Sequence, residues 1–81
     1  MKVKLLFFAS CRDIVGVRDL ELEVDVDIII ADLKEPLIAL YPRLRSIKKV
    51  LSVAVNAQYV HDSYEISSGD EIAFIPPVSG G

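Results

Sequence analysis

Charged and apolar side chains alternate strictly along residues 19–28 of the chain. Odd positions are acidic and even positions are apolar; the two sets are Asp19, Glu21, Glu23, Asp25 and Asp27, and Leu20, Leu22, Val24, Val26 and Ile28. A period of two is typical of a β-strand that has one face on the core and the other in water. We therefore predict a strand over residues 19–28 with a solvated acidic face.

An earlier segment, residues 2–9, is rich in residues that favour strands and is too short for a core helix. Its alternation places Val3, Leu5 and Phe7 on one face. Ser10 is expected to cap a short helix over residues 11–15, which Gly16 ends. The tight connection that follows makes the two strands a predicted antiparallel pair.

The main helix is predicted over residues 29–41, where apolar residues recur at spacings of three and four. This stripe consists of Ile30, Leu33, Leu37, Leu40 and Tyr41. Pro36 conflicts with the helix, because an interior proline removes a backbone hydrogen bond. Either the helix begins late, so that Pro36 lies in its first turn, or it bends there. After Pro42, a basic segment that is helical in part is expected over residues 43–49.

The remaining strands are predicted over residues 50–56, 59–60 and 71–75, with a loop and one helical turn over residues 61–68. The resulting order is strand, strand, helix, strand, short strand, strand. An α+β fold of the β-grasp, or ubiquitin-like, type accommodates this order, with a mixed sheet of four to five strands and one main helix on one face. We expect residues 1–76 to form this domain and residues 77–81 a flexible, protruding Gly-Gly tail.

Length, charge and cysteine content narrow the possible functions. The chain has 81 residues, which suits one domain, and its net charge of −3 disfavours nucleic acid as a partner. The apolar run near the N-terminus is short and is followed by Arg12, so we predict neither a leader nor a membrane partner. With a single cysteine, the chain is expected in the reducing cytoplasm.

Few residues are candidates for catalysis or metal binding. Cys11 and His61 are the only residues of their types, so no metal site is expected, and Cys11 is interpreted as a packing residue and His61 as a surface residue. The acidic residues of the predicted strand are too spread to converge on one ion. The basic side chains of the segment after Pro42 are interpreted as solvated surface; they are Arg43, Arg45, Lys48 and Lys49.

The end of the sequence is the strongest candidate for chemistry. Pro76 and Pro77 stop the last strand and force an extended path, and the residues that follow them are Val78, Ser79, Gly80 and Gly81. Because the last two have no side chain, such a tail can enter a narrow channel and present the Gly81 carboxylate. Gly81 is therefore the predicted reactive residue, with Pro77, Val78, Ser79 and Gly80 as its tail.

An apolar surface for a partner is also predicted. Leu6 and Phe8 alternate out of the face that packs on the helix, and Ala73 and Ile75 do the same on the last strand. If these two strands are neighbours, the four side chains form one exposed patch beside the tail, with Arg12 close by to pair with an acidic group.

The sequence resembles a known family, the small, sulfur-carrier subunits of molybdopterin synthase. The resemblance is carried by Leu5-Leu6-Phe7-Phe8-Ala9 with Arg12-Asp13 and Gly16, by Val53-Ala54-Val55-Asn56 with Tyr59-Val60, by Gly69-Asp70-Glu71-Ile72-Ala73, and most specifically by the terminal Pro76-Pro77-Val78-Ser79-Gly80-Gly81. It implies a carrier that binds no cofactor and has no catalytic residues of its own beyond its carboxylate.

According to the resemblance, an ATP-dependent, ubiquitin-activating-like enzyme adenylates Gly81, and sulfur transfer makes a thiocarboxylate. The chain then docks on the large subunit of a heterotetrameric synthase and gives its sulfur to cyclic pyranopterin monophosphate, forming the dithiolene of molybdopterin. Two alternatives share the architecture: a sulfur carrier for thiazole synthesis or tRNA thiolation, and a ubiquitin-like protein modifier.

Overall fold

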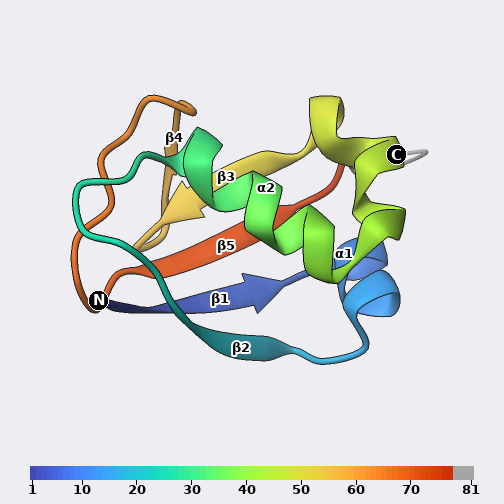
Figure 1. Cartoon of the computed structure of the whole chain (residues 1–81). Coiled ribbons are helices and arrows are strands. Elements are labelled where there is room, and N and C mark those ends of the chain that lie inside the picture. Colours follow the sequence, from blue (N-terminus) through green and yellow to red (C-terminus); the bar gives the residue numbers. More distant parts are fainter. Residues whose placement is uncertain (78–81) are drawn as a thin grey trace.

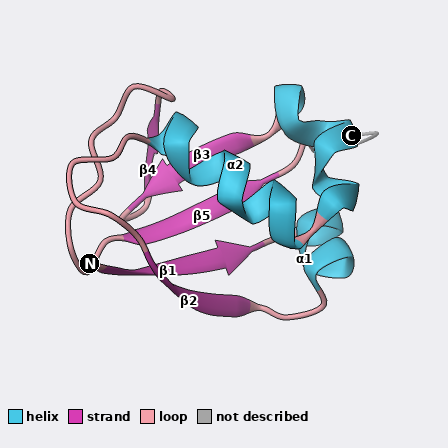
Figure 2. Ribbon diagram, viewed as in Figure 1, coloured by secondary structure: helices cyan, strands magenta, loops and turns pink. Residues whose placement is uncertain are grey.

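Eight elements follow one another in the computed structural model of the chain, which describes residues 1–77 (Figures 1 and 2). They are β1 (Lys2–Phe7), α1 (Ala9–Val15), β2 (Asp19–Glu23), α2 (Ile30–Leu40), the 3-10 helix η1 (Pro42–Val50), β3 (Ser52–Val55), β4 (Gln58–Val60) and β5 (Glu71–Ile75). The five strands form one mixed sheet in the order β2-β1-β5-β3-β4. The predicted β-grasp fold is therefore confirmed.

The centre of the sheet is the parallel pair β1 and β5, and all other neighbours are antiparallel. Helix α2 crosses one face of the sheet (Figure 1). Because residues of a strand alternate between its faces, β1 turns Val3, Leu5 and Phe7 toward the core, as predicted, and all three are buried. The Phe7 and Phe74 rings stack with centroids 5.9 Å apart, joining the two central strands through their side chains.

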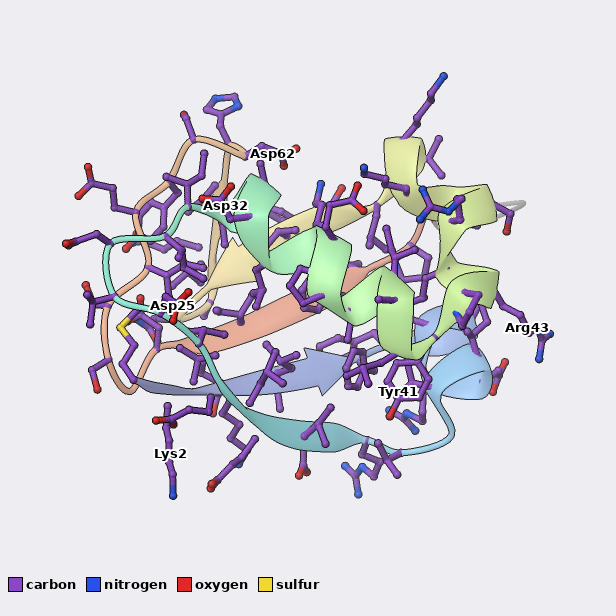
Figure 3. All side chains as sticks on the ribbon, viewed as in Figure 1. Lys2, Asp25, Asp32, Tyr41, Arg43 and Asp62 are labelled. Carbon is purple, nitrogen blue, oxygen red and sulfur yellow. The ribbon has the colours of Figure 1, made fainter. Side chains whose placement is uncertain are left out.

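Ile29, the residue before α2, makes no side-chain hydrogen bond that caps the helix. Two carbonyls of the β4–β5 connection, which comes later in the chain, replace the cap: Ile30 N donates to Tyr64 O and Ala31 N to Asp62 O, each at 3.0 Å. Asp62 also binds the buried Lys34, with Nζ to Oδ1 at 2.8 Å, and Figure 3 shows it beside the start of α2. These contacts satisfy backbone donors that a helix start would otherwise leave unpaired.

Several predicted segment boundaries were wrong. Strand β2 ends at Glu23 rather than at residue 28, because the chain turns toward α2, with Asp27 in the left-handed region at φ 60°. Helix α1 begins at Ala9 with Phe8 before it, and Ser10 is not its cap; Gly16 ends it as predicted, with φ 88°. The connection over residues 61–68 contains turns but no helical turn.

The position of α2 on the sheet differs in detail from the predicted stripe. Leu40 is 57% exposed, and Ile38 is buried in its place. Pro36 lies inside the helix, so a late start is excluded. Pro36 lies on the exposed side of the helix, where water can donate a hydrogen bond to the backbone carbonyl four residues earlier, which receives none from proline. The basic segment forms η1, the 3-10 helix that follows Tyr41 at the end of α2 (Figure 3).

A buried carboxylate fastens the β3–β4 turn to the start of β5. Asp70 Oδ1 accepts from Asn56 Nδ2 at 3.1 Å, and its Oδ2 accepts from Ser67 N at 2.8 Å. Asn56 Oδ1 in turn accepts from Glu71 N at 3.1 Å. The network thus holds together two turns that are far apart in sequence.

Replacing Asp70 with Ala is expected to lower the free energy of unfolding by about 1–3 kcal/mol, because the Ser67 and Asn56 donors lose their acceptor. Asp70→Asn, which keeps one acceptor oxygen, should lose less. Urea denaturation of both variants measures this, and equal losses would show that the carboxylate does not act through these hydrogen bonds.

Burial also makes the thiol of Cys11 hard to ionise: it raises the pKa of Cys11 from 9.0 to about 11. Because the pKa of Cys11 is higher in the folded state than in the unfolded state, the protonated thiol favours folding. This contribution to the free energy of unfolding is complete below pH 9 and is lost as the pH rises through 11. Between these values the wild type should lose more stability than Cys11→Ala, as measured by urea denaturation at each pH. If the stability of the two proteins depended on pH in the same way, the Cys11 thiol would not be the cause of the loss.

Candidate functional site

The face of the sheet that α2 leaves open carries a row of side chains across four strands. Leu6 of β1 is paired with Ala73 of β5, Ala73 with Ala54 of β3, and Ala54 with Tyr59 of β4. Residues paired in this way point to the same face. Three of these side chains are aliphatic and the fourth is aromatic, which is unusual for a sheet face turned to solvent.

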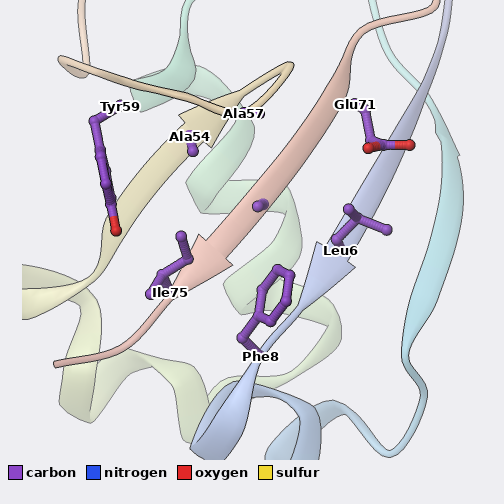
Figure 4. A pocket seen from close by; sticks show the side chains of 8 residues that line it. Leu6, Phe8, Ala54, Ala57, Tyr59, Glu71 and Ile75 are labelled. Carbon is purple, nitrogen blue, oxygen red and sulfur yellow. The ribbon is translucent and has the colours of Figure 1, made fainter. Parts of the chain in front are cut away.

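A hollow of about 340 Å³ lies over this row (Figure 4). Its lining residues are Leu6, Phe8, Ala54, Ala57, Tyr59, Glu71, Ala73 and Ile75. Phe8 is 41% and Tyr59 72% exposed, so two aromatic rings stand at the surface of the hollow. We call this set the open-face hollow. It contains all four apolar residues predicted for partner binding.

Arg12 lies beside the open-face hollow, as the sequence predicted. It lines a neighbouring hollow with Leu6, Phe8, Arg18 and Asp19, and its Nε donates to Phe7 O at 3.4 Å. This hydrogen bond holds part of the guanidinium against the end of β1. Its role in binding a partner stays a prediction.

Four residues that line the open-face hollow were not predicted from the sequence: Ala54, Ala57, Tyr59 and Glu71. Tyr59 and Ala57 enter the open-face hollow because only two residues, Asn56 and Ala57, connect β3 to β4, which pairs Val55 with Gln58. A two-residue connection between short β-branched segments is a hairpin signal. Applied to residues 53–60, that rule would have placed Tyr59 opposite Ala54.

The C-terminal segment leaves the sheet at the same end as the aromatic side of the hollow. Strand β5 ends at Ile75, Pro76 is buried and Pro77 is exposed. Phe8 N donates to Phe74 O at 3.3 Å, so Phe8 lies next to the end of β5. Val78, Ser79, Gly80 and Gly81 lie outside the described residues, and their predicted role as a reactive tail stays a prediction, as does the domain boundary after residue 76.

Other candidate groups are poorly placed for chemistry. Cys11 is fully buried with a raised pKa, and His61 is exposed. On η1, Lys48 and Arg45 both pair with Glu35, and the pKa of Glu35 is lowered mainly by its hydrogen bond from Lys48. In residues 1–77 no group of acidic, His or Cys side chains could hold a metal ion, and no helix there is long and apolar enough to cross a membrane.

Comparison with known proteins gives a consistent set of relatives. The ThiS family pattern matches residues 5–81. The molybdopterin synthase sulfur carrier subunit of Chlamydomonas reinhardtii is 39% identical over the full length of both chains, and that of Homo sapiens is 34% identical over 99% of this chain and 94% of its own.

Solved structures share the fold. SAMP1 from Haloferax volcanii superposes with a TM-score of 0.85 at 26% identity, covering both chains completely. A chain in the complex of subunits 1 and 2 of a molybdopterin-converting factor from Helicobacter pylori gives a TM-score of 0.71 at 21% identity, and the match covers both chains completely. With its pattern matched from Leu5 to Gly81, and with full-length relatives at more than 30% identity, this chain belongs to the ThiS family, among the molybdopterin synthase sulfur carrier subunits.

Proposed function

We propose that this chain carries sulfur for a molybdopterin synthase, as a thiocarboxylate on Gly81. The observation that carries the proposal is the family match that extends through Gly81, together with full-length relatives named as sulfur carrier subunits. The described part of the chain supports a carrier rather than a self-contained enzyme, since its thiol is buried and its single imidazole stands on a surface loop.

The chemistry explains why such a carrier needs an activating partner. A free carboxylate is a poor electrophile, so one of its oxygens first attacks the α-phosphate of ATP and releases pyrophosphate. The terminal sulfur of a persulfide donor then attacks the acyl carbon and expels AMP, which leaves an acyl disulfide. A thiol cleaves the sulfur–sulfur bond of this acyl disulfide and forms a new disulfide with the donor, so the Gly81 carboxyl is released with one sulfur in place of one oxygen. The ATP is bound by the partner, and ATP-dependent activation is consistent with a cytoplasmic location.

The thiocarboxylate is the form that acts on the final substrate. Its charge lies largely on sulfur, which makes it a better nucleophile than the carboxylate. We propose that it transfers sulfur to cyclic pyranopterin monophosphate in the active site of the large subunit. One carboxyl delivers one sulfur, so the two sulfurs of a dithiolene require two loaded carriers or one that is loaded twice.

The open-face hollow is the proposed docking surface for the large subunit. Exposed aromatic residues around an apolar floor are typical of interface centres, and Arg12 supplies a charge at the rim. The location also suits the function, because Ile75 lines the hollow one residue before the chain leaves the sheet at Pro76. A fold relative from Helicobacter pylori was solved as a complex of subunits 1 and 2.

Attachment to proteins is the second candidate function. It is favoured by the likeness to SAMP1, since the Haloferax volcanii protein of that name is a small archaeal modifier protein. A modifier would form an amide between Gly81 and a lysine of a target. Carriers for thiazole synthesis or tRNA thiolation would use the same thiocarboxylate with another acceptor.

Intact-mass analysis separates these candidates. After incubation with ATP, the adenylating enzyme and a sulfur donor, the wild type should gain about 16 Da, the difference between sulfur and oxygen. A chain lacking Gly81 should gain nothing and should keep the wild-type unfolding midpoint. Sulfur uptake by the shortened chain would contradict the carrier proposal. So would a wild-type chain that gains no sulfur and is found only in amide linkage to lysines of other proteins.

Phe8→Lys should weaken binding to the large subunit at least tenfold, because it places a charge in an apolar interface. Leu40→Lys is the matched control, since Leu40 is exposed on α2, away from the open-face hollow. Calorimetric titration of both variants tests the surface, with circular dichroism to verify folding. Equal affinity of Phe8→Lys and wild type would exclude this face.

A further inference from the structure

Ala57 has a backbone conformation that alanine rarely adopts. Asn56 and Ala57 form the two-residue turn between β3 and β4, with φ of 50° and 72°. Both central positions of such a turn require positive φ, and asparagine followed by glycine is the favoured pair. Asparagine tolerates this region, whereas the Cβ of alanine crowds its own backbone.

The surrounding hydrogen bonds prevent the turn from relaxing. Asn56 N donates to Glu71 O at 2.9 Å, and Glu71 N returns a hydrogen bond to Asn56 Oδ1 at 3.1 Å. Asn56 Nδ2 is held by the buried Asp70. A different turn would break these contacts and the pairing of Val55 with Gln58, so the left-handed conformation is imposed on residue 57.

The side chain of Ala57 is part of the open-face hollow. Figure 4 shows it at the end of the hairpin, and it lines the hollow together with Ala54 and Tyr59. A glycine at this position would fit the backbone better but would remove the methyl group from the wall. Strained backbone positions concentrate at functional sites, where surrounding structure maintains them.

We propose that Ala57 is a partner-contact residue, whose methyl group packs against an apolar side chain of the large subunit. This inference rests on the proposed function of the open-face hollow. It implies opposite effects on two properties: the methyl group destabilises the free chain and strengthens the complex. A residue with only a structural role would not separate them in this way.

Three variants test the proposal. Ala57→Gly removes both the strain and the methyl group, and Ala57→Asn relieves the strain without adding backbone freedom but places an amide in the hollow. Asp27→Gly is the matched control, because Asp27 also has positive φ, at 60°, and does not line the hollow. Each variant is titrated with purified large subunit and melted alone.

Ala57→Gly should unfold a few degrees above the wild type and bind the large subunit about three- to fivefold more weakly, the effect expected for one buried methyl group. Ala57→Asn should also bind at least threefold more weakly, without a loss of thermal stability. Asp27→Gly should bind as the wild type does.

Wild-type affinity in Ala57→Gly, or a lower unfolding temperature in that variant, would overturn the inference while leaving the docking proposal intact. Failure of the wild type to bind, or equal binding by Phe8→Lys, would instead contradict the proposed docking face itself, and this inference with it.

Discussion

The parallel pairing of β1 with β5 is the constraint on which the rest of the structure depends. Leu5 is paired with Ile72 and Phe7 with Phe74, so both strands turn the same alternate positions toward α2. The intervening pair, Leu6 and Ala73, then necessarily faces the other way. One register therefore builds the core and aligns the open-face hollow, and it brings Phe8 and the exit of the chain to the same end of the sheet.

The two faces of the sheet thus serve different purposes. The covered face supplies stability, because the apolar side of α2 packs against it together with the stacked phenylalanines. The open face leaves apolar side chains in water, an arrangement that is unfavourable for the free chain and is typical of interaction surfaces. This division suits the proposed carrier, because the core of the fold does not depend on the face that is proposed to meet a partner.

Much of this arrangement could be predicted from sequence, because burial of one face imposes a period of two on a strand. The alternation of residues 2–8 identified both the core residues of β1 and the outward Leu6 and Phe8. The features that were missed depend on distant partners: β2 ends early because the chain turns toward α2, and α2 is capped by carbonyls of Asp62 and Tyr64. Burial of Ile38 instead of Leu40 depends on how the helix crosses the sheet. Tyr59 could be placed in the open-face hollow only from the β3–β4 register.

The acidic face of β2 has a further consequence for the assembly state. Strand β2 lies at one edge of the sheet, and its Asp19, Glu21 and Glu23 side chains are exposed. Free edges invite other chains to add strands, and like charges oppose such additions. The other edge, β4, is only three residues long. Neither border therefore favours polymerisation into extended sheets.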